Sequence, residues 1–326
     1  MDLGTANTLI YVEGRGIVLD EPTVIAMDNH GEVVRYGQRA KEFLGKSPPN
    51  LQVIRPMKEG VIRDFSAITK FIHCCLRDAA QGRRPLSPRV IVCVPSQITV
   101  VEKRAVMDAV KSAGYSKVFL IDEVMAAAIG CGTDLVDSKP VMVVDIGGGT
   151  TEMAVISEMA YLCCRSRRIA GTDMDEAIES WLRREYGIWI GPNSAERLKW
   201  EHGAVARDLI DKKTVEIAGK DLDSRRPARC TIDLHGLVDT LVPYAEIIAE
   251  EINEAILNLE PGVRESIERE GVLLTGGSSL LRGLRQYLQE KTGLSMNQPP
   301  SPLTTVITGA GKAMEDFQQM RPVFVN

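Results

Sequence analysis

The chain has 326 residues, 44% of them hydrophobic and 25% charged, which excludes a disordered or fibrous protein. A length above roughly 250 to 300 residues predicts two domains, because single cores rarely grow larger. The 39 basic and 44 acidic residues give a net charge of −5, which argues against a general nucleic-acid-coating role. The sequence has neither a signal-peptide pattern nor an uninterrupted apolar run of roughly 18 to 20 residues. We therefore expect a cytoplasmic protein whose membrane contact is peripheral, and reduced, buried cysteines.

Strands and helices alternate in the first half of the chain. Apolar, β-branched runs predict strands at Arg89–Val94, Lys117–Ile121 and Val141–Ile146. Helical stretches such as Val101–Ser112 separate them. This alternation predicts α/β layers.

The second half predicts a small inserted subdomain and a long helix. Thr214–Ala218 and Ala228–Asp233 read as strands on either side of the polar stretch Gly219–Pro227. A helix is expected from Leu234 to Asn258, with core positions at spacings of three and four, namely Leu237, Leu241, Ala245, Ile248 and Ile252. The Pro-rich stretch Gln298–Pro302 predicts a short turn before a last helix.

One short sequence motif occurs twice. Asp2-Leu3-Gly4-Thr5 precedes the apolar run Thr8–Val12, and Asp145–Thr150 precedes Met153–Ile156. Each copy reads as a strand, an acidic residue, a Gly-rich turn and a returning strand. The chain therefore looks like two related halves, which we expect to join near Ala126–Gly130.

The repeated turns predict a phosphate site. Three glycines after Asp145 let consecutive backbone N–H groups face an anion, and Asp145 is placed to hold a divalent cation through water. One such loop could equally be a structural hairpin turn. Two of them, at Asp2–Thr8 and Asp145–Thr151, predict a clamp on both sides of a nucleotide's phosphates. Neither fits a Walker A or a GxGxxG pattern.

A third Gly-rich element, Leu274–Leu281, is predicted to follow a strand and open a helix. Such a turn suits the close approach of a flat base or ribose. Taken alone, it is no more than a strand-to-helix turn.

The chain resembles the actin-like ATPase superfamily, and within it the MreB/Mbl family, along essentially its whole length, in segments that include DLGTANTLIYV, VIRPMKEGVI, LIDEVMAAAIG, VVDIGGGTTEMAVIS, AERLKWEHG and LLTGGSSLLRGL. The resemblance implies an actin-like (ribonuclease H-like, duplicated) α/β fold with a nucleotide cleft between two lobes. The first lobe would span 1–130 with a small subdomain at about 21–75, and the second 131–326 with one at about 190–235.

The resemblance also implies a function. It predicts a slow ATPase that binds ATP and Mg²⁺, and head-to-tail protofilaments that pair antiparallel on the inner membrane. Expected partners are further copies of the chain, cell-wall elongation proteins and a membrane-spanning anchor, in the maintenance of rod shape. A small-molecule kinase with the same ATP clamp is the alternative; a heat-shock chaperone or an FtsA-type adaptor fits less well.

Site residues follow from the same resemblance. The phosphate contacts would come from Thr5, Ala6, Asn7, Gly147, Gly148, Gly149 and Thr150, the metal site from Asp2 and Asp145, the adenosine contacts from Glu196, Arg197 and Lys199, and the base contacts from Gly276, Gly277 and Ser278.

Glu123 is the predicted catalytic carboxylate. It would orient a water toward the terminal phosphate, with Thr150 holding the same water. The family usually has Glu where this chain has Asp122 and Pro where it has Val124. Glu123 could instead be a helix N-terminal acid that complements the helix dipole.

The chain also departs from the family at its start and in one loop. It begins at Met1-Asp2, which predicts a short first strand and offers no leader for membrane anchoring. The family's lipid-contacting loop corresponds to Gln81–Pro88, where only Leu86 is apolar. Arg83 and Arg84 could attract anionic headgroups at about 1 kcal/mol each.

Membrane binding should therefore depend on assembly, because many weak contacts add up only when subunits are linked. Polymerised protein should co-sediment with anionic liposomes, whereas monomer should stay in the supernatant. Neutral liposomes serve as the control. Equal binding by monomer and polymer would remove this hypothesis.

Overall fold

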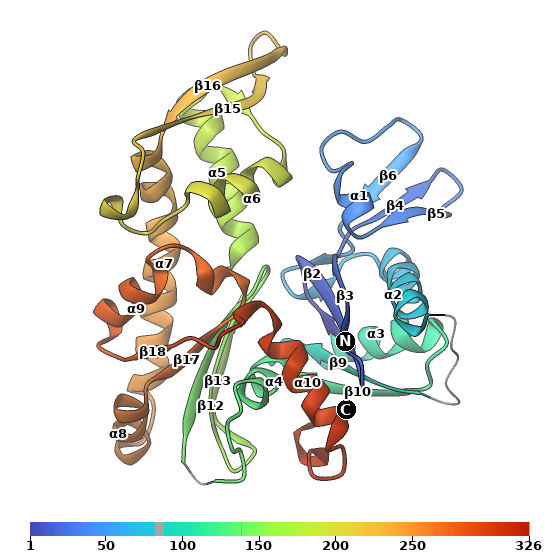
Figure 1. Cartoon of the computed structure of the whole chain (residues 1–326), viewed down its shortest axis with the longest axis vertical. Coiled ribbons are helices and arrows are strands. Elements are labelled where there is room, and N and C mark those ends of the chain that lie inside the picture. The colour runs from blue at the N-terminus through green and yellow to red at the C-terminus, as the bar shows by residue number, and fades with distance from the viewer. Residues whose placement is uncertain (82–87, 138, 326) are drawn as a thin grey trace.

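The computed structural model describes residues 1–81, 88–137 and 139–325. Most of the loop predicted to contact lipid, including Arg83, Arg84 and Leu86, lies outside these residues. Two large sheets form two units side by side, which we call the first and second lobes (Figure 1). None of the helices in the described ranges is long and apolar enough to cross a membrane.

The first lobe is built on a five-stranded sheet in the order β10-β9-β1-β2-β3. Its strands are β1 (Asp2–Leu3), β2 (Asn7–Val12), β3 (Gly16–Pro22), β9 (Arg89–Val94) and β10 (Lys117–Asp122). The helices α2 (Phe65–Ala80) and α3 (Val100–Ser112) belong to this lobe. β1 is as short as predicted, and a capping box between Thr99 and Glu102 fixes the start of α3.

A small sheet in the order β5-β4-β6 extends from the first lobe. It contains β4 (Ile25–Asp28), β5 (Val33–Tyr36) and β6 (Leu51–Ile54), together with the short helix α1 (Gln38–Lys41). The hairpin of β7 (Met57–Lys58) and β8 (Val61–Ile62) returns the chain to the main sheet.

The second lobe repeats this plan in the order β13-β12-β11-β17-β18. Its strands are β11 (Val141–Ile146), β12 (Thr151–Ser157), β13 (Ala160–Arg167), β17 (Val272–Thr275) and β18 (Met296–Asn297). β1 pairs antiparallel with β2 and parallel with β9, just as β11 pairs with β12 and β17. The duplication read from the repeated phrase is confirmed.

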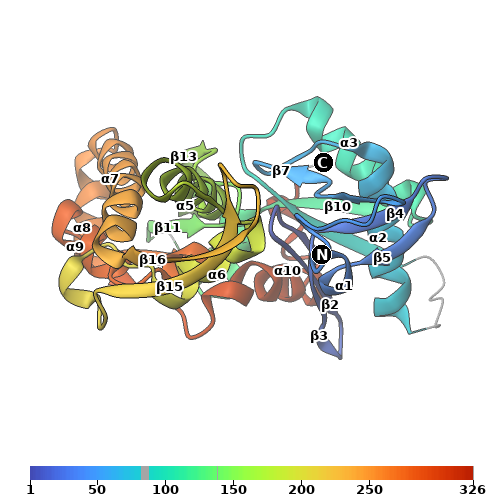
Figure 2. The same ribbon diagram turned by 90° about the horizontal axis from the view of Figure 1, so that it is seen from above.

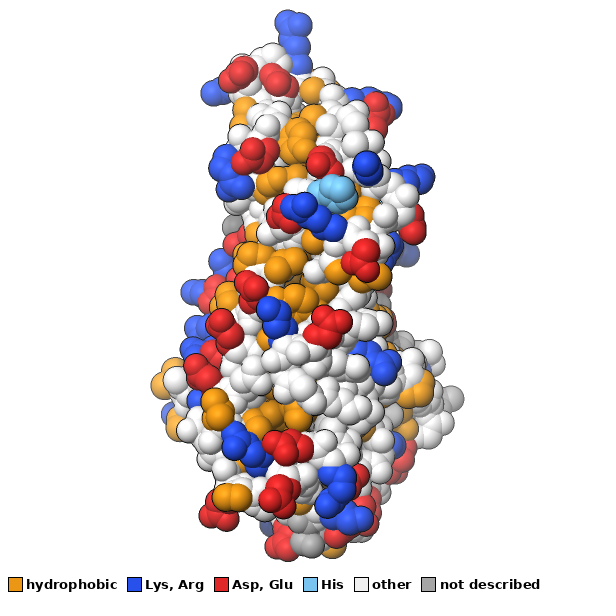
Figure 3. Space-filling view, turned by 90° about the vertical axis from the view of Figure 1, so that its left-hand side faces the viewer, with side chains coloured by type: hydrophobic (Ala, Val, Ile, Leu, Met, Phe, Trp, Pro, Cys, Tyr) orange, Lys and Arg blue, Asp and Glu red, His pale blue; other side chains and the backbone are white. Residues whose placement is uncertain are grey.

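Helices and a second small sheet complete this lobe (Figures 1 and 2). The helices are α5 (Gly171–Tyr186), α6 (Pro192–His202), α7 (Leu234–Leu257), α8 (Pro261–Glu270) and α9 (Leu284–Thr292), and the small sheet holds β14 (Ile188–Trp189), β15 (Thr214–Asp221) and β16 (Pro227–Asp233). The five predicted core positions of the long helix are all buried. On the outer face in Figure 3, acidic and basic side chains are interspersed around apolar ones.

Two sequence predictions need correction. The hairpin strands extend further than predicted, to Asp221 and from Pro227, so part of the polar stretch is strand. Gly219 permits this because it lies against the Trp189 backbone. The Gly-rich element Leu274–Leu281 opens a 3₁₀ turn (Gly277–Leu280), and α9 starts only after Gly283, which has a φ of 82°. The residues at which the two halves are expected to join, Ala126–Gly130, belong to the helix α4 (Glu123–Gly130), and this junction stays a prediction.

Three large groups of buried apolar side chains hold the fold together, one in each lobe and a third that both lobes share. The shared core joins strands of both sheets to α4 and α10 (Thr305–Glu315), through residues that include Ile91, Ile121, Val143, Ala154 and Ala310.

The predicted division of the chain at residue 130, with one insert in each lobe, stays a proposal. The two small sheets lie at about the positions predicted for the two inserts. All seven cysteines are free thiols.

The helices α4 and α10 cross with their backbones in direct contact, at Gly130 and Gly309. A Cβ atom on Gly309 would lie 1.8 Å from the Ala126 carbonyl oxygen, and one on Gly130 would lie 2.1 Å from the Thr305 carbonyl oxygen. Neither partner is the end of a flexible side chain, so the helix axes would have to separate.

Gly309→Ala should therefore lower the free energy of unfolding by about 2 to 4 kcal/mol, although alanine favours a helix. Urea unfolding followed by circular dichroism measures this. The control is Gly262→Ala in α8, where a Cβ meets no atom within 4 Å. It should change stability by less than about 1 kcal/mol, and equal effects at both sites would contradict the crossing.

Candidate functional site

The two repeated turns lie at equivalent places in the two lobes. The first glycine loop (Asp2–Thr8) connects β1 to β2, where Leu3 pairs with Thr8. The second glycine loop (Asp145–Thr151) connects β11 to β12, where Ile146 pairs with Thr151. Each loop therefore closes the hairpin at the centre of its own sheet.

These two loops touch each other. A Cβ atom on Gly148 would lie 2.7 Å from the Ala6 Cβ, and one on Gly149 would lie 2.3 Å from the Thr5 hydroxyl oxygen. Any side chain at either glycine would push the lobes apart. The structure thus brings together Thr5 and Ala6 with Gly148 and Gly149, as the clamp requires.

Backbone and side-chain hydrogen bonds fix both loops. Thr5 Oγ1 accepts from the Gly60 N–H at 2.9 Å, and the Ala6 carbonyl accepts from the Thr23 N–H at 2.9 Å. In the second loop, the Gly148 carbonyl accepts from the Thr172 N–H at 2.7 Å, where α5 begins. Thr5 and Thr150 are buried, whereas Ala6, Asn7, Gly147 and Gly148 are partly exposed.

The third Gly-rich element joins the second glycine loop. The Ser278 hydroxyl donates to the Gly147 carbonyl at 2.7 Å. A Cβ on Gly276 would lie 2.3 Å from Asp145 Oδ1, and its φ of 85° also favours glycine. Of the predicted base residues, Gly276 therefore lies beside Asp145 and Ser278 beside Gly147, whereas Gly277 lies against Leu303.

The three α6 residues expected near adenosine point to different places. Lys199 is buried, donates to the Gly171 carbonyl at 2.6 Å and pairs with Asp175 at 2.8 Å. Glu196 pairs instead with Lys41 of the first lobe at 2.5 Å. Arg197 is largely exposed on another face of the helix. Only Lys199 lies directly beside the glycine loops, because Gly171 also donates to the Gly147 carbonyl.

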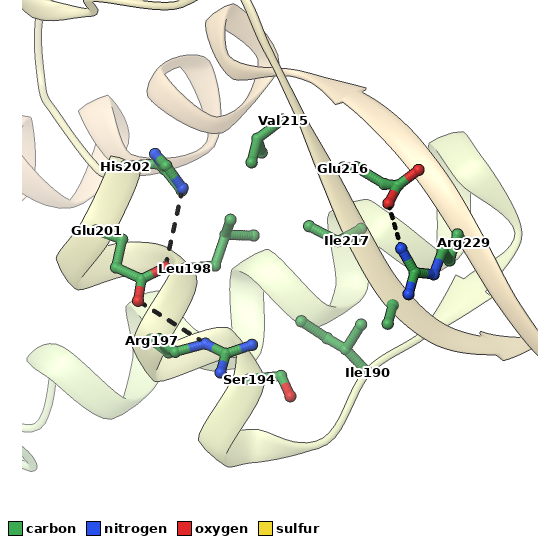
Figure 4. Close-up of a pocket in the computed structure, with 11 residues that line it drawn as sticks. Ile190, Ser194, Arg197, Leu198, Glu201, His202, Val215, Glu216, Ile217 and Arg229 are labelled. Atoms are coloured by element: carbon green, nitrogen blue, oxygen red, sulfur yellow. Dashed lines mark hydrogen bonds and ion pairs between the residues drawn. The ribbon is translucent and has the colours of Figure 1, made fainter.

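Arg197 lines a separate cavity of about 240 Å³ between α6 and the β15–β16 hairpin (Figure 4). Its floor consists of the aliphatic side chains of Ile190, Leu198, Val215 and Ile217. None of the glycine-loop residues lines this cavity.

Four acidic groups gather beneath the glycine loops. Burial raises the pKa of Asp2 to about 6, although the N-terminal ammonium lowers it. Burial also raises the pKa of Asp145 to about 8, and the neighbouring Asp2 and Glu152 raise it further. Burial and the neighbouring acids raise the pKa of Glu123 well above its ordinary value. Burial also raises the pKa of Glu152, against the hydrogen bonds that it accepts. Asp2 and Asp145 are thus close, as the clamp needs.

This acidic group fits a hydrated cation better than a directly coordinated one. Asp145 Oδ1 and Glu152 Oε1 are buried without a hydrogen-bond partner. Among the described residues, no three His, Cys, Asp or Glu side chains converge with the spacing of metal ligands. Mg²⁺ keeps several of its waters when bound, so isolated carboxylate oxygens suit it.

Glu123 begins α4 directly after β10. The preceding residue, Asp122, accepts a hydrogen bond from the Tyr161 hydroxyl at 2.9 Å, and the following residue, Val124, is fully buried. The loop is therefore held by packing although it lacks the family's proline. Glu123 has both features weighed from the sequence: it is a helix N-terminal acid, and it lies within the electrostatic reach of Asp2 and Asp145.

Sequence reasoning missed several residues at this site. Glu152 accepts hydrogen bonds from the Ser96 N–H at 2.7 Å and the Ser96 hydroxyl at 2.5 Å. Asp175 holds Lys199, and burial raises its pKa to about 6 although Lys199 lowers it. Glu152 could have been singled out from the sequence because it is an acid inside an apolar strand. Nothing in the sequence indicates that Ser96 binds Glu152 or that Asp175 binds Lys199.

Comparisons with known proteins show what the chain is similar to. The model of the MreB/Mbl protein family matches residues 1–322. The cell shape-determining protein MreB of Escherichia coli strain K12 is 43% identical over 322 residues, covering 97% of this chain and 92% of its own. Mbl of Bacillus subtilis strain 168 is 34% identical over 321 residues, covering 98% and 96%.

Solved structures agree as well. MreB5 of Spiroplasma citri bound to ADP superposes with a TM-score of 0.90 at 28% identity, covering 98% of this chain and 96% of that one. The same protein bound to AMPPNP superposes with a TM-score of 0.89. The MamK double helical filament gives 0.76 at 17% identity, a likeness of fold alone.

Asp145→Asn should stabilise the ligand-free protein at pH 8 by roughly 1 to 3 kcal/mol, and by less than half as much at pH 5. An acid whose pKa is about 8 when folded and 3.8 in the unfolded chain holds its proton more tightly in the folded state. Its stabilisation is present at low pH and is lost as the pH rises from about 4 to about 8. Because asparagine does not ionise, the variant does not lose this stability as the pH rises.

Urea unfolding at both pH values measures the effect, with the exposed Asp223→Asn as the control. A lower stability of Asp145→Asn at pH 8, or a gain that does not depend on pH, would contradict the assignment.

Proposed function

Because the chain belongs to the MreB/Mbl family, bacterial actins with a role in cell shape, we propose that it binds ATP with Mg²⁺ between its lobes and hydrolyses it slowly to control its own assembly. The contact between the two glycine loops carries this proposal. It brings the bare backbone of Gly148 and Gly149 directly against Ala6 and Thr5 of the other lobe. Such a surface suits a polyphosphate tail.

The phosphate and metal side of the site follows from the loops. Thr5, Ala6 and Asn7 would contact the phosphates from one lobe, and Gly147 to Thr150 from the other. Asp2 and Asp145 would hold the waters of Mg²⁺, which supplies positive charge against the phosphates when it is bound. The partnerless oxygen of Asp145 supports this role.

The adenosine side would lie between α6 and the third Gly-rich element. Lys199 and Ser278 are both held beside the second glycine loop, which supports their assignment. The ADP and AMPPNP complexes of the related MreB5 support an adenine nucleotide. Glu196 would contribute from the preceding turn of α6, whereas the outward position of Arg197 makes a contact with adenosine least favourable for that residue.

For hydrolysis, Glu123 would accept a hydrogen bond from the attacking water and orient it toward the terminal phosphate, with Thr150 as a second contact. Its position at the start of α4, beside the acidic group, supports this. Catalysis would consist mainly of positioning, which agrees with a slow enzyme.

Family membership also supports the wider proposal. Copies of the chain would assemble head to tail into protofilaments that pair antiparallel on the inner membrane. There they would organise cell-wall elongation proteins with a membrane-spanning anchor, and so maintain rod shape.

Glu123→Ala should keep ATP binding and slow phosphate release by about 100-fold, because the water loses its orienting carboxylate. Phosphate release and ATP-dependent sedimentation of filaments are measured together. The control is Glu265→Ala, which removes an exposed acid of α8. Unchanged release by Glu123→Ala would sink the catalytic role, and persistent monomers of the unaltered chain with ATP and Mg²⁺ would oppose the filament role.

A further inference from the structure

The two small inserts meet through one residue of α1. The Lys41 ammonium pairs with Glu196 Oε2 at 2.5 Å, and the Lys41 carbonyl accepts a hydrogen bond from Asn193 Nδ2 at 2.7 Å. Both the side chain and the backbone of Lys41 are therefore held by α6 of the other lobe. The neighbouring chain also approaches, since a Cβ on Gly45 would lie 3.8 Å from the Gly191 Cα.

This ion pair differs from the other bridges between the lobes. The side chains of Lys41 and Glu196 are each only 16% exposed. Lys58 and Glu176 are 3.9 Å apart and 51% and 61% exposed. Arg168, which is 52% exposed, lies 3.5 Å from Glu102 and 3.9 Å from Glu59. Exposed, distant pairs are screened by water and salt, so Lys41–Glu196 is the strongest of these four bridges.

The bridge attaches to a wall of the proposed nucleotide site. Glu196 lies one turn before Lys199, whose ammonium binds the Gly171 carbonyl. Gly171 in turn donates to the Gly147 carbonyl of the second glycine loop. A bond from Lys41 to α6 thus ties the first lobe to the helix that flanks the adenosine side (Figure 1).

We propose that Lys41 is a positioning residue that clasps the two inserts together, so that nucleotide enters and leaves the site only when the Lys41–Glu196 and Lys41–Asn193 bonds open. This inference rests on the proposed nucleotide site. The clasp lies at the inserts, away from the glycine loops. Its loss therefore lowers the barrier for entry and exit alike and leaves the affinity nearly unchanged.

The test is stopped-flow kinetics of a fluorescent ATP analogue with Mg²⁺, at a protein concentration below that of assembly. Lys41→Ala should accelerate both association and dissociation about tenfold, which corresponds to about 1.4 kcal/mol, and change the Kd less than about threefold. Lys41→Arg keeps the charge and should retain slow exchange. Arg39→Ala, an exposed cation of the same helix, should behave like the unaltered chain.

Salt gives a second readout that a merely structural role would not move. Between about 0.05 M and 0.5 M salt, the exchange rates of the unaltered chain should rise by only part of their difference from Lys41→Ala, because an ion pair with little exposure is screened only in part. The rates of Lys41→Ala should stay nearly flat.

Equal rates in Lys41→Ala and the unaltered chain would overturn the clasp alone. So would faster dissociation with unchanged association, because that pattern belongs to a direct ligand contact. If the unaltered chain bound no analogue, the proposed function would fail and the clasp with it.

Discussion

The whole site depends on a contact between the lobes in which one of the two turns has no room for side chains. Gly148 and Gly149 of one lobe lie so close to Ala6 and Thr5 of the other that a single added carbon would overlap with them. The lobes can therefore bring two hairpin turns to one point only if one turn is made of glycine. A turn of glycines can also present backbone N–H groups to an anion, so the packing and the proposed binding require the same residue type.

The acidic residues beneath the loops, unlike the glycines, are unfavourable for the stability of the fold. Asp2, Asp145, Glu123 and Glu152 lie near one another, and burial raises the pKa of each. A fold selected for stability alone would avoid this arrangement, because burying neighbouring carboxylates is costly. Functional sites commonly contain such groups. The lobes thus meet around charges that favour a cationic partner.

Much of this could be predicted from the sequence because the signals were local. The phrase around Asp2 and its repeat around Asp145 predicted two equivalent sheets, and spacing within Leu234–Asn258 predicted the buried face of α7. Contacts between distant segments could not be predicted. Lys41 and Ser96 have ordinary neighbours, and only the fold brings them to Glu196 and Glu152.

Local signals also failed where a glycine's surroundings decided its role. The pattern at Leu274–Leu281 is that of a helix start, yet Gly276 and Gly283 both adopt positive φ and restrict the segment to a 3₁₀ turn. Similarly, the polar composition of Gly219–Pro227 concealed strand pairing, because the sheet forms there around Gly219. The assignment of Glu196, Arg197 and Lys199 as one group treated neighbours in sequence as neighbours in space, and α6 directs them apart.

The shared core has a consequence for how the molecule loses its structure. Val143 and Ala154 of the second lobe are buried against the same group of side chains as Ile91 and Ile121 of the first, with Ala310 of α10 among them. Neither duplicated half can melt without exposing apolar surface of the other. The two lobes therefore form one cooperative unit, and a chain severed after α4 would leave two pieces that each lack part of their interior.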